Sequence, residues 1–280
     1  MFNPDSTAFF IPFVGHPVAW YGILFSTACF VGFFLLRLSL IRFFRLIDPS
    51  LCTRASFLAE KMTVYAVIGL IAGARIVHLL FYEHPVYYLR DPFTLFRVWE
   101  GGLAGHGGVV GLFVVLFLFL RKYGGEIPSL SFLRLTDLLV CSAMAVGFFV
   151  RIGNFINQEV VGRATRLPWA VCFGSPAGAL PAVPRHPTQL YEAAFFACAC
   201  LLFIRLLPGK VTEAGGLTGI CMCITFIFRF AVEFLKEEQS ALLRGDLFTM
   251  GHYLSIPFIL VGTCLVVIGR VRSGEISRSG

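Results

Sequence analysis

Charged residues are scarce in this 280-residue chain. Lys, Arg, Asp and Glu together make up 14% of the sequence, whereas a soluble domain carries about 25%. Hydrophobic residues make up 57%, and the mean hydropathy is +0.81. So few charges exclude an ordinary soluble domain and predict an integral membrane protein.

Basic runs and disulfide-like cysteine patterns are also missing. The net charge is +7, but Lys and Arg are spread over the loops, so we expect no nucleic-acid partner. The charge relates instead to topology and to anionic lipids. The first 17 residues contain no Lys or Arg, so we expect no cleavable signal peptide. Most of the nine cysteines lie in apolar segments, which favours packing roles over disulfides or a metal site.

Long apolar segments dominate the rest of the sequence. Seven of them approach the roughly 20 residues that a helix needs to cross a bilayer. They lie near residues 18–36, 64–82, 103–120, 135–151, 188–207, 217–235 and 253–269. No internal repeat or low-complexity linker divides the chain. The sequence therefore predicts an all-α bundle of about seven transmembrane helices in a single domain, 1–280.

The distribution of Lys and Arg predicts the orientation of the bundle. Alternate loops and the C-terminal tail collect 13 basic residues on one side, against 8 on the side of the N-terminal tail. Because cytoplasmic loops are enriched in Lys and Arg, the N-terminus is expected outside and the C-terminus inside. The long loop segments near 83–102 and 152–187 then face the outside.

The most informative polar segment directly follows an apolar run. Residues 151–163 read Arg-Ile-Gly-Asn-Phe-Ile-Asn-Gln-Glu-Val-Val-Gly-Arg, immediately after residues 138–150. On a continuing helix, Arg151, Asn154 and Gln158 share one face, with Glu159 beside them. A forked cation, amides and a carboxylate at a membrane edge suit an anionic lipid head group. An ordinary polar loop outside the bilayer is the alternative.

A glycine-rich segment surrounds a single histidine at the start of the third span. Five glycines between 101 and 108 flank His106. Glycine permits a close approach of the backbone, and an imidazole with a pKa of about 6.5 suits proton abstraction. A glycine turn with a hydrogen-bonding histidine is the alternative.

Ionisable residues also occur within expected spans. Arg229 and Glu233 are four residues apart, as in a simple helical ion pair, but intramembrane charges frequently mark functional sites. The simple ion pair therefore stands beside a second interpretation, in which Arg229 contacts a phosphate or a leaving group and Glu233 orients it. Arg75 begins a polar stripe in the second span, where a structural network and a substrate contact are both open.

Two further polar groups stand where spans begin. The segment 185–192 opens the fifth span with Pro187, and its polar side chains favour structural support. Trp20 and Tyr21 lie at the start of the first span, where aromatic residues of an interfacial belt are typical.

In combination these motifs resemble the prolipoprotein diacylglyceryl transferase family of bacteria, over nearly the whole chain. The resemblance rests on the following segments, in family order: Trp20-Tyr21-Gly22, Gly73-Ala74-Arg75, Gly101-Gly102 through His106-Gly107-Gly108, Arg151-Ile152-Gly153-Asn154-Phe155-Ile156-Asn157 with Glu159 and Gly162, His186-Pro187 through Tyr191-Glu192, and Arg229-Phe230 through Glu233-Phe234. The sequence departs from the family at His252, where Gln is usual, and at Ala104-Gly105.

The resemblance implies a seven-span enzyme of the bacterial inner membrane, with its active site toward the outer face. Its substrates would be phosphatidylglycerol in the bilayer and the lipobox cysteine of a preprolipoprotein signal peptide, with glycerol phosphate released. No metal or cofactor is expected.

Site roles follow from the resemblance together with the chemistry of these residues. His106 is the expected base for the thiol, and Arg151 and Arg229 are expected to bind the phosphate. The other expected head-group contacts are Asn154, Glu159, Glu233 and Tyr21. The expected supporting residues are Arg75, Asn157, Gly162, His186, Tyr191 and Glu192.

Three other classes of protein compete with this interpretation. A transporter of an anionic solute or lipid would explain the intramembrane charges, but no matching pair of broken spans is visible. A metal-dependent lipid phosphotransferase would need clustered aspartates, and the five aspartates are scattered. A membrane serine protease would need a Gly-x-Ser-x-Gly setting, which the sequence lacks.

Overall fold

A computed structural model describes residues 1–12, 17–83, 90–98, 102–127, 129–178, 180–207, 214–237 and 248–278. Gly101 and parts of the expected loop near 83–102 lie outside these ranges. Within them, seven helices are long and apolar enough to span a membrane, so the predicted all-α architecture is confirmed. These helices are α1 (Trp20–Ile47), α2 (Ala55–Phe81), α4 (Gly105–Tyr123), α5 (Phe132–Ile156), α6 (Thr188–Leu206), α7 (Gly216–Glu233) and α8 (Met250–Arg278).

The first two helices run well past the predicted spans. α1 continues to Ile47 because Leu40, Phe43 and Phe44 extend its buried face, while Arg37 and Arg45 are exposed. The Asp48 carboxylate then accepts a hydrogen bond from the Ser50 amide and caps the 3-10 helix η1 (Pro49–Arg54), which leads into α2. Basic residues therefore shorten the apolar segment without ending the helix.

Glycines bring neighbouring helices into backbone contact. A β-carbon at Gly73 would lie 2.3 Å from the Gly107 carbonyl oxygen, and one at Gly111 would lie 2.0 Å from that of Gly69. This contact joins α2 to α4 as small residues commonly do in membranes. Part of the glycine-rich segment at 101–108 therefore serves helix packing.

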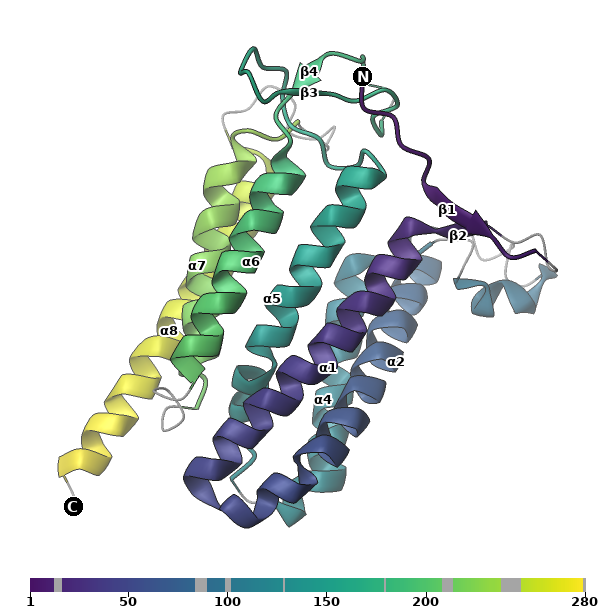
Figure 1. Cartoon of the computed structure of the whole chain (residues 1–280). Helices are drawn as coiled ribbons and strands as arrows, with labels where there is room; N and C mark the ends of the chain where they lie inside the picture. Colours follow the sequence, from purple (N-terminus) through teal and green to yellow (C-terminus); the bar gives the residue numbers. More distant parts are fainter. Residues whose placement is uncertain are drawn as a thin grey trace.

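The order of packing separates α7 and α8 from most of the bundle. α2 packs chiefly on α4, α1 on α5, α5 on α6, and α7 on α8, whereas contacts from α7 to α5 and α6 are few (Figure 1). One apolar core lies among α1, α2, α4 and α5 around Phe43 and Phe119. A second joins α5, α6 and α7 around Phe203.

Short strands gather at one end of the bundle. β1 (Thr7–Phe10) pairs with β2 (Pro17–Ala19), and β3 (Val171–Cys172) pairs with β4 (Pro184–Arg185). The sequence did not predict these strands. The N-terminus and β3–β4 lie at the end where α5 stops and α6 begins, and the C-terminus lies at the other end (Figure 1). Two further 3-10 helices lie between the spans, η2 (Pro92–Phe96) and the one-turn η4 (Gly124–Glu126).

Two sequence expectations near this end need correction. The loop expected to start near 152 starts later, because α5 continues to Ile156. The continuing helix that would align Gln158 with Arg151 is wrong, since Gln158 adopts a left-handed φ of 56°. Its amide donates to Asn3 and accepts from the Ser175 backbone, so Gln158 ties the N-terminal segment to the loop after α5.

Candidate active site

The last turns of α5 present a connected row of polar side chains. Arg151 donates from Nη1 to Asn154 Oδ1 at 3.2 Å, and Asn154 Nδ2 donates to Glu159 Oε2 at 2.9 Å. Asn157 Nδ2 lies 3.4 Å from the other oxygen of Glu159. The structure therefore brings together four residues of the predicted block, with Asn154 between the cation and the carboxylate.

Backbone strain and hydrogen bonds fix the position of Glu159. Its neighbours Gln158 and Val160 have φ values of 56° and 54°, which are unusual for residues other than glycine. The Glu159 amide donates to the Asn154 carbonyl at 2.8 Å, and its carbonyl accepts from Gln189 Nε2 at 2.7 Å. Strained positions of this kind persist where the surroundings determine them, often at functional sites.

Glu192 joins Arg151 to Lys236, which is not among the predicted site residues. Glu192 Oε1 lies 3.2 Å from Arg151 Nη2 and 2.9 Å from Lys236 Nζ. Glu192 is 3% exposed and Lys236 is 5% exposed. Burial lowers the pKa of Lys236 and Arg151 lowers it further, whereas Glu192 and Glu233 raise it. Lys236 lies three residues after Glu233, and this spacing of opposite charges is the sequence signal that could have selected it.

The loop after α7 holds Lys236 by its backbone. Lys236 pairs with Gly162 as an isolated antiparallel bridge, and the Arg163 amide donates to the Leu235 carbonyl at 2.8 Å. A β-carbon at Gly162 would lie 2.4 Å from the His186 carbonyl oxygen and 2.9 Å from that of Leu235. Only glycine leaves room for the three segments to meet, which fits the supporting role expected for Gly162.

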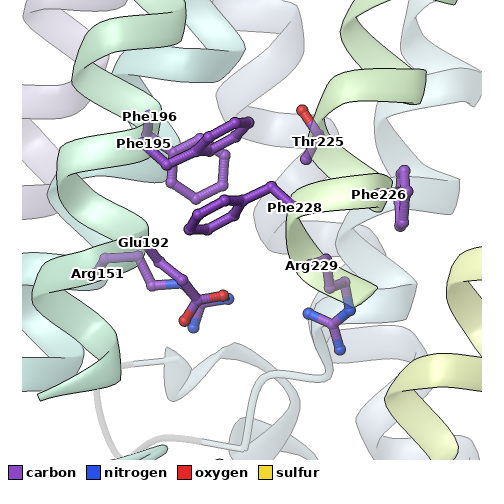
Figure 2. Close-up of a pocket in the computed structure, with 8 residues that line it drawn as sticks. All are labelled: Arg151, Glu192, Phe195, Phe196, Thr225, Phe226, Phe228 and Arg229. Atoms are coloured by element: carbon purple, nitrogen blue, oxygen red, sulfur yellow. The ribbon is translucent and has the colours of Figure 1, made fainter. Parts of the chain in front are cut away.

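A cavity of about 130 Å³ lies between α5, α6 and α7. The rings of Phe195, Phe196 and Phe228 lie on one side of it, and the charged ends of Arg151 and Arg229 lie on the other (Figure 2). Phe195 and Phe228 stack with ring centroids 4.1 Å apart. The cavity therefore combines an apolar wall with two guanidinium groups. Its lining residues are Arg151, Glu192, Phe195, Phe196, Thr225, Phe226, Phe228 and Arg229.

Arg229 and Glu233 do not form the ion pair that their spacing indicates. Glu233 Oε1 accepts from the Thr249 hydroxyl at 3.0 Å, and its other oxygen lies 3.7 Å from Lys236 Nζ. The expectation that Glu233 orients Arg229 is therefore wrong in this structure. Within the described ranges, Arg229 forms no ion pair or side-chain hydrogen bond, and its guanidinium remains available at the cavity.

Tyr21 reaches the polar row from α1. A β-carbon at Gly153 would lie 2.7 Å from the Tyr21 ring, so the glycine lets the ring pack directly on α5. There the phenol interacts electrostatically with Glu159 and Arg151. The interfacial-belt alternative does not account for this contact, which places Tyr21 beside the predicted head-group residues.

His106 stands apart from this network. It is exposed in the first turn of α4, and no hydrogen bond or ion pair links its side chain to the part of the chain that the structure describes. Arg75 is buried and donates to the carbonyl groups of Thr94, Leu95 and Gly102. Of the two alternatives for Arg75, these contacts favour a structural network that holds the segment between α2 and α4.

The remaining supporting residues form the outer layer. His186 Nδ1 lies 3.4 Å from the Tyr191 hydroxyl, which also accepts from Trp169 Nε1 at 2.8 Å. Arg185 forms an ion pair with Glu237 at 2.7 Å. Within the described ranges, no group of three or more His, Cys, Asp or Glu residues could hold a metal ion.

Comparisons with known proteins agree with the motifs. The family model described as prolipoprotein diacylglyceryl transferase matches residues 8–268. A phosphatidylglycerol–prolipoprotein diacylglyceryl transferase of Tolumonas auensis is 38% identical, over 90% of this chain and 91% of its own length. Proteins of the same name from Protochlamydia amoebophila and Chlamydia pneumoniae are 31% and 35% identical, over 94% and 90% of this chain. These two matches span 93% and 88% of the relatives' own lengths. The chain therefore belongs to the prolipoprotein diacylglyceryl transferase family.

Proposed function

We propose that this protein transfers the diacylglyceryl group of phosphatidylglycerol to the lipobox cysteine of preprolipoproteins, the first step of lipoprotein maturation. One observation carries the proposal within the structure: Arg151 and Arg229 stand at one edge of a cavity whose other side is aromatic. Guanidinium forks match phosphate oxygens, and an apolar wall matches the part of the lipid next to the phosphate. The transporter alternative has no such support, since the relatives named above are transferases.

The reaction exchanges one bond to carbon for another. The cysteine sulfur forms a bond to the terminal glyceryl carbon of the diacylglyceryl group, and the bond from that carbon to the phosphate oxygen breaks. Glycerol phosphate leaves with the bonding electron pair, and the thiol proton passes to a base. Nothing is oxidised or reduced, so the step needs no redox partner.

The arginines would stabilise the leaving group. Charge develops on the phosphate oxygen as the bond to carbon breaks, and cations already in place lower the free energy of that state. Arg229 has no ion pair within the described ranges to give up when phosphate binds. Asn154 holds Arg151 by one nitrogen and Glu159 by its own amide group, so it would keep the fork oriented.

The thiol needs activation, because a cysteine with a pKa of about 8.5 is mostly protonated at neutral pH. His106 is the base that the sequence favours. It lies in the first turn of α4, at the bundle end that also holds the start of α1 and the end of α5. A peptide bound across this end would bring its thiol to the histidine. The positive charges of Arg151 and Arg229 would lower the pKa of the thiol.

The expected topology places this chemistry outside the cytoplasm. With the N-terminus outside, the ends of α5 and α7 and the loops between them face the outer surface of the bacterial inner membrane. A preprolipoprotein presents its cysteine there, directly after the apolar part of its signal peptide. The lipid would reach the cavity sideways, with its acyl chains remaining in the bilayer.

The test is an assay of the purified protein with phosphatidylglycerol and a lipobox peptide, analysed by mass spectrometry. We expect a mass gain of one diacylglyceryl group on the cysteine, together with released glycerol phosphate. A peptide with serine in place of the cysteine is the matched control and should stay unmodified. No mass gain with well-folded protein would overturn the proposal.

A further inference from the structure

One oxygen of the Glu192 carboxylate has no hydrogen-bond partner among the described residues. Oε1 holds both Arg151 and Lys236, at 3.2 and 2.9 Å, whereas Oε2 is buried and accepts no hydrogen bond there. Glu192 lines the cavity beside Arg151 (Figure 2). A buried carboxylate oxygen is costly without a donor, so the cavity favours a ligand that supplies one.

The charges around Glu192 restrict what that donor can be. Arg151 and Lys236 already contact the carboxylate, and Arg229 lines the same cavity. Burial lowers the pKa of Lys236, and the two carboxylates next to it, Glu192 and Glu233, oppose that effect. An ammonium group approaching Oε2 would therefore meet two cations already bound to the same carboxylate. A neutral hydroxyl meets no such repulsion.

Phosphatidylglycerol carries hydroxyl groups on the glycerol beyond its phosphate, whereas an ethanolamine lipid carries an ammonium at that distance. With the phosphate between Arg151 and Arg229, the diacylglyceryl side of the lipid would face the aromatic rings, and the glycerol on the other side of the phosphate would lie beside Glu192. Glu192 lines the same cavity and is in ion-pair contact with Arg151, so its carboxylate lies next to the position of that phosphate.

We propose that Glu192 and Lys236 select the head group of the lipid: Glu192 Oε2 accepts a hydroxyl of the glycerol, and Lys236 repels an ammonium. This inference rests on the proposed function and assigns its lipid preference to a named pair. Lys236 acts through Glu192 and through its own charge, and does not contact the reacting atoms.

Removing only one member of the pair would leave a buried charge and could unfold the protein. The main test variant is therefore the double substitution Glu192→Gln with Lys236→Met. The Gln side chain still offers an amide oxygen to a hydroxyl, but the cation is gone. The matched control is Glu60→Gln with Lys61→Met, which removes the anion and the cation of one exposed ion pair outside the cavity.

The measurement is kcat/KM for transfer to a lipobox peptide from vesicles of phosphatidylglycerol or of phosphatidylethanolamine. We expect the wild-type protein and the control to prefer phosphatidylglycerol strongly. In the double variant the ratio of the two values should fall about tenfold or more, because the repulsive charge has been removed. Lys236→Arg keeps the cation and should keep the ratio.

An unchanged ratio in a folded double variant would overturn the proposal, with the proposed function intact. If the double variant does not fold, the single variant Lys236→Gln replaces it, because its amide keeps a donor for Glu192 Oε1 without the charge. The same fall in the ratio of the two kcat/KM values is expected. A wild-type protein that transfers from neither lipid would instead reject the proposed function, and the inference with it.

Discussion

Asn154 accepts a hydrogen bond from Arg151 across 3.2 Å, and both residues lie in the last turns of α5. The other end of the same amide donates to Glu159 at 2.9 Å. One side chain therefore contacts a cation and an anion at once, and links the position of Arg151 to that of Glu159.

Asn154→Ala should lower kcat/KM for phosphatidylglycerol by about 10- to 100-fold, the loss typical of a hydrogen bond to a charged group. Arg151 loses the acceptor that orients it, and Glu159 loses its shortest side-chain donor. Gln158→Ala is the control, because that amide contacts Asn3 and Ser175 instead. It should lower the melting temperature and retain activity. Equal activity losses in the two variants would contradict an orienting role for Asn154.

Arg229→Ala and Arg151→Ala should each lower kcat by about 100-fold, or about 3 kcal/mol in the barrier. Their stabilities should differ. Arg229 has no ion pair within the described ranges, so its loss should leave the melting temperature in detergent close to that of the wild type. Arg151→Ala removes one of two cations from Glu192 and should lower it. Full activity in a normally expressed Arg151→Ala protein would reject its assignment to the phosphate.

His106→Gln should lower the rate at neutral pH by about 100-fold, the ordinary contribution of a general base. The deficit should shrink as the pH rises past about 8.5, because the thiol then ionises without help. A pH series of kcat for both proteins checks this. Wild-type activity of His106→Gln at pH 7 would mean that the arginines alone activate the thiol.

Much of this arrangement was predictable from local sequence. Apolar runs gave all seven helices, because a helix that crosses a bilayer satisfies its own backbone and exposes apolar side chains. The spacing of Arg151 and Asn154 predicted their shared face, since both lie before the helix ends at Ile156. The left-handed backbone of Gln158 was not predictable in this way, because the turn after Ile156 contains no glycine or proline that would indicate a helix end.

Contacts between distant segments were not predictable in the same way. Glu192 was expected only to support the site, yet it binds Arg151 from the next helix. Lys236 lies just past the last residue of α7, and its partner Glu192 belongs to α6, so the contact depends on how the two helices pack. Helical spacing paired Arg229 with Glu233, but Thr249 and Lys236 provide the partners that Glu233 uses instead.

Gly162→Ala should destabilise the protein by about 2 kcal/mol, as overpacking does when no flexible side chain can yield. The added carbon would meet two backbone carbonyl oxygens, those of His186 and Leu235. Gly125→Ala is the control, because nothing lies within 4 Å of its β-carbon position. Thermal unfolding in detergent compares the two. If Gly162→Ala and Gly125→Ala have the same melting temperature, the backbone at Gly162 does not pack closely on His186 and Leu235.

The charge of Lys236 should make lipid binding depend on pH. Burial lowers its pKa from the ordinary value of 10.5, and Arg151 lowers it further, against the opposing effects of Glu192 and Glu233. Between the folded-state pKa and 10.5 the unfolded chain binds more protons, so this group raises the free energy of unfolding as the pH rises there. Over the same window Glu192 loses one of its two cations and holds Arg151 more strongly.

We therefore expect the KM for phosphatidylglycerol to rise as Lys236 loses its proton, because the phosphate must then compete with Glu192 for Arg151. Lys236→Arg should abolish this rise, since a guanidinium with a pKa above about 12 stays charged. Ionisation of the substrate thiol affects both proteins equally, so it cancels in the comparison. The measurement is KM from about pH 7 to about pH 10 for both proteins. Parallel curves would show that the proton on Lys236 does not control the Arg151 fork.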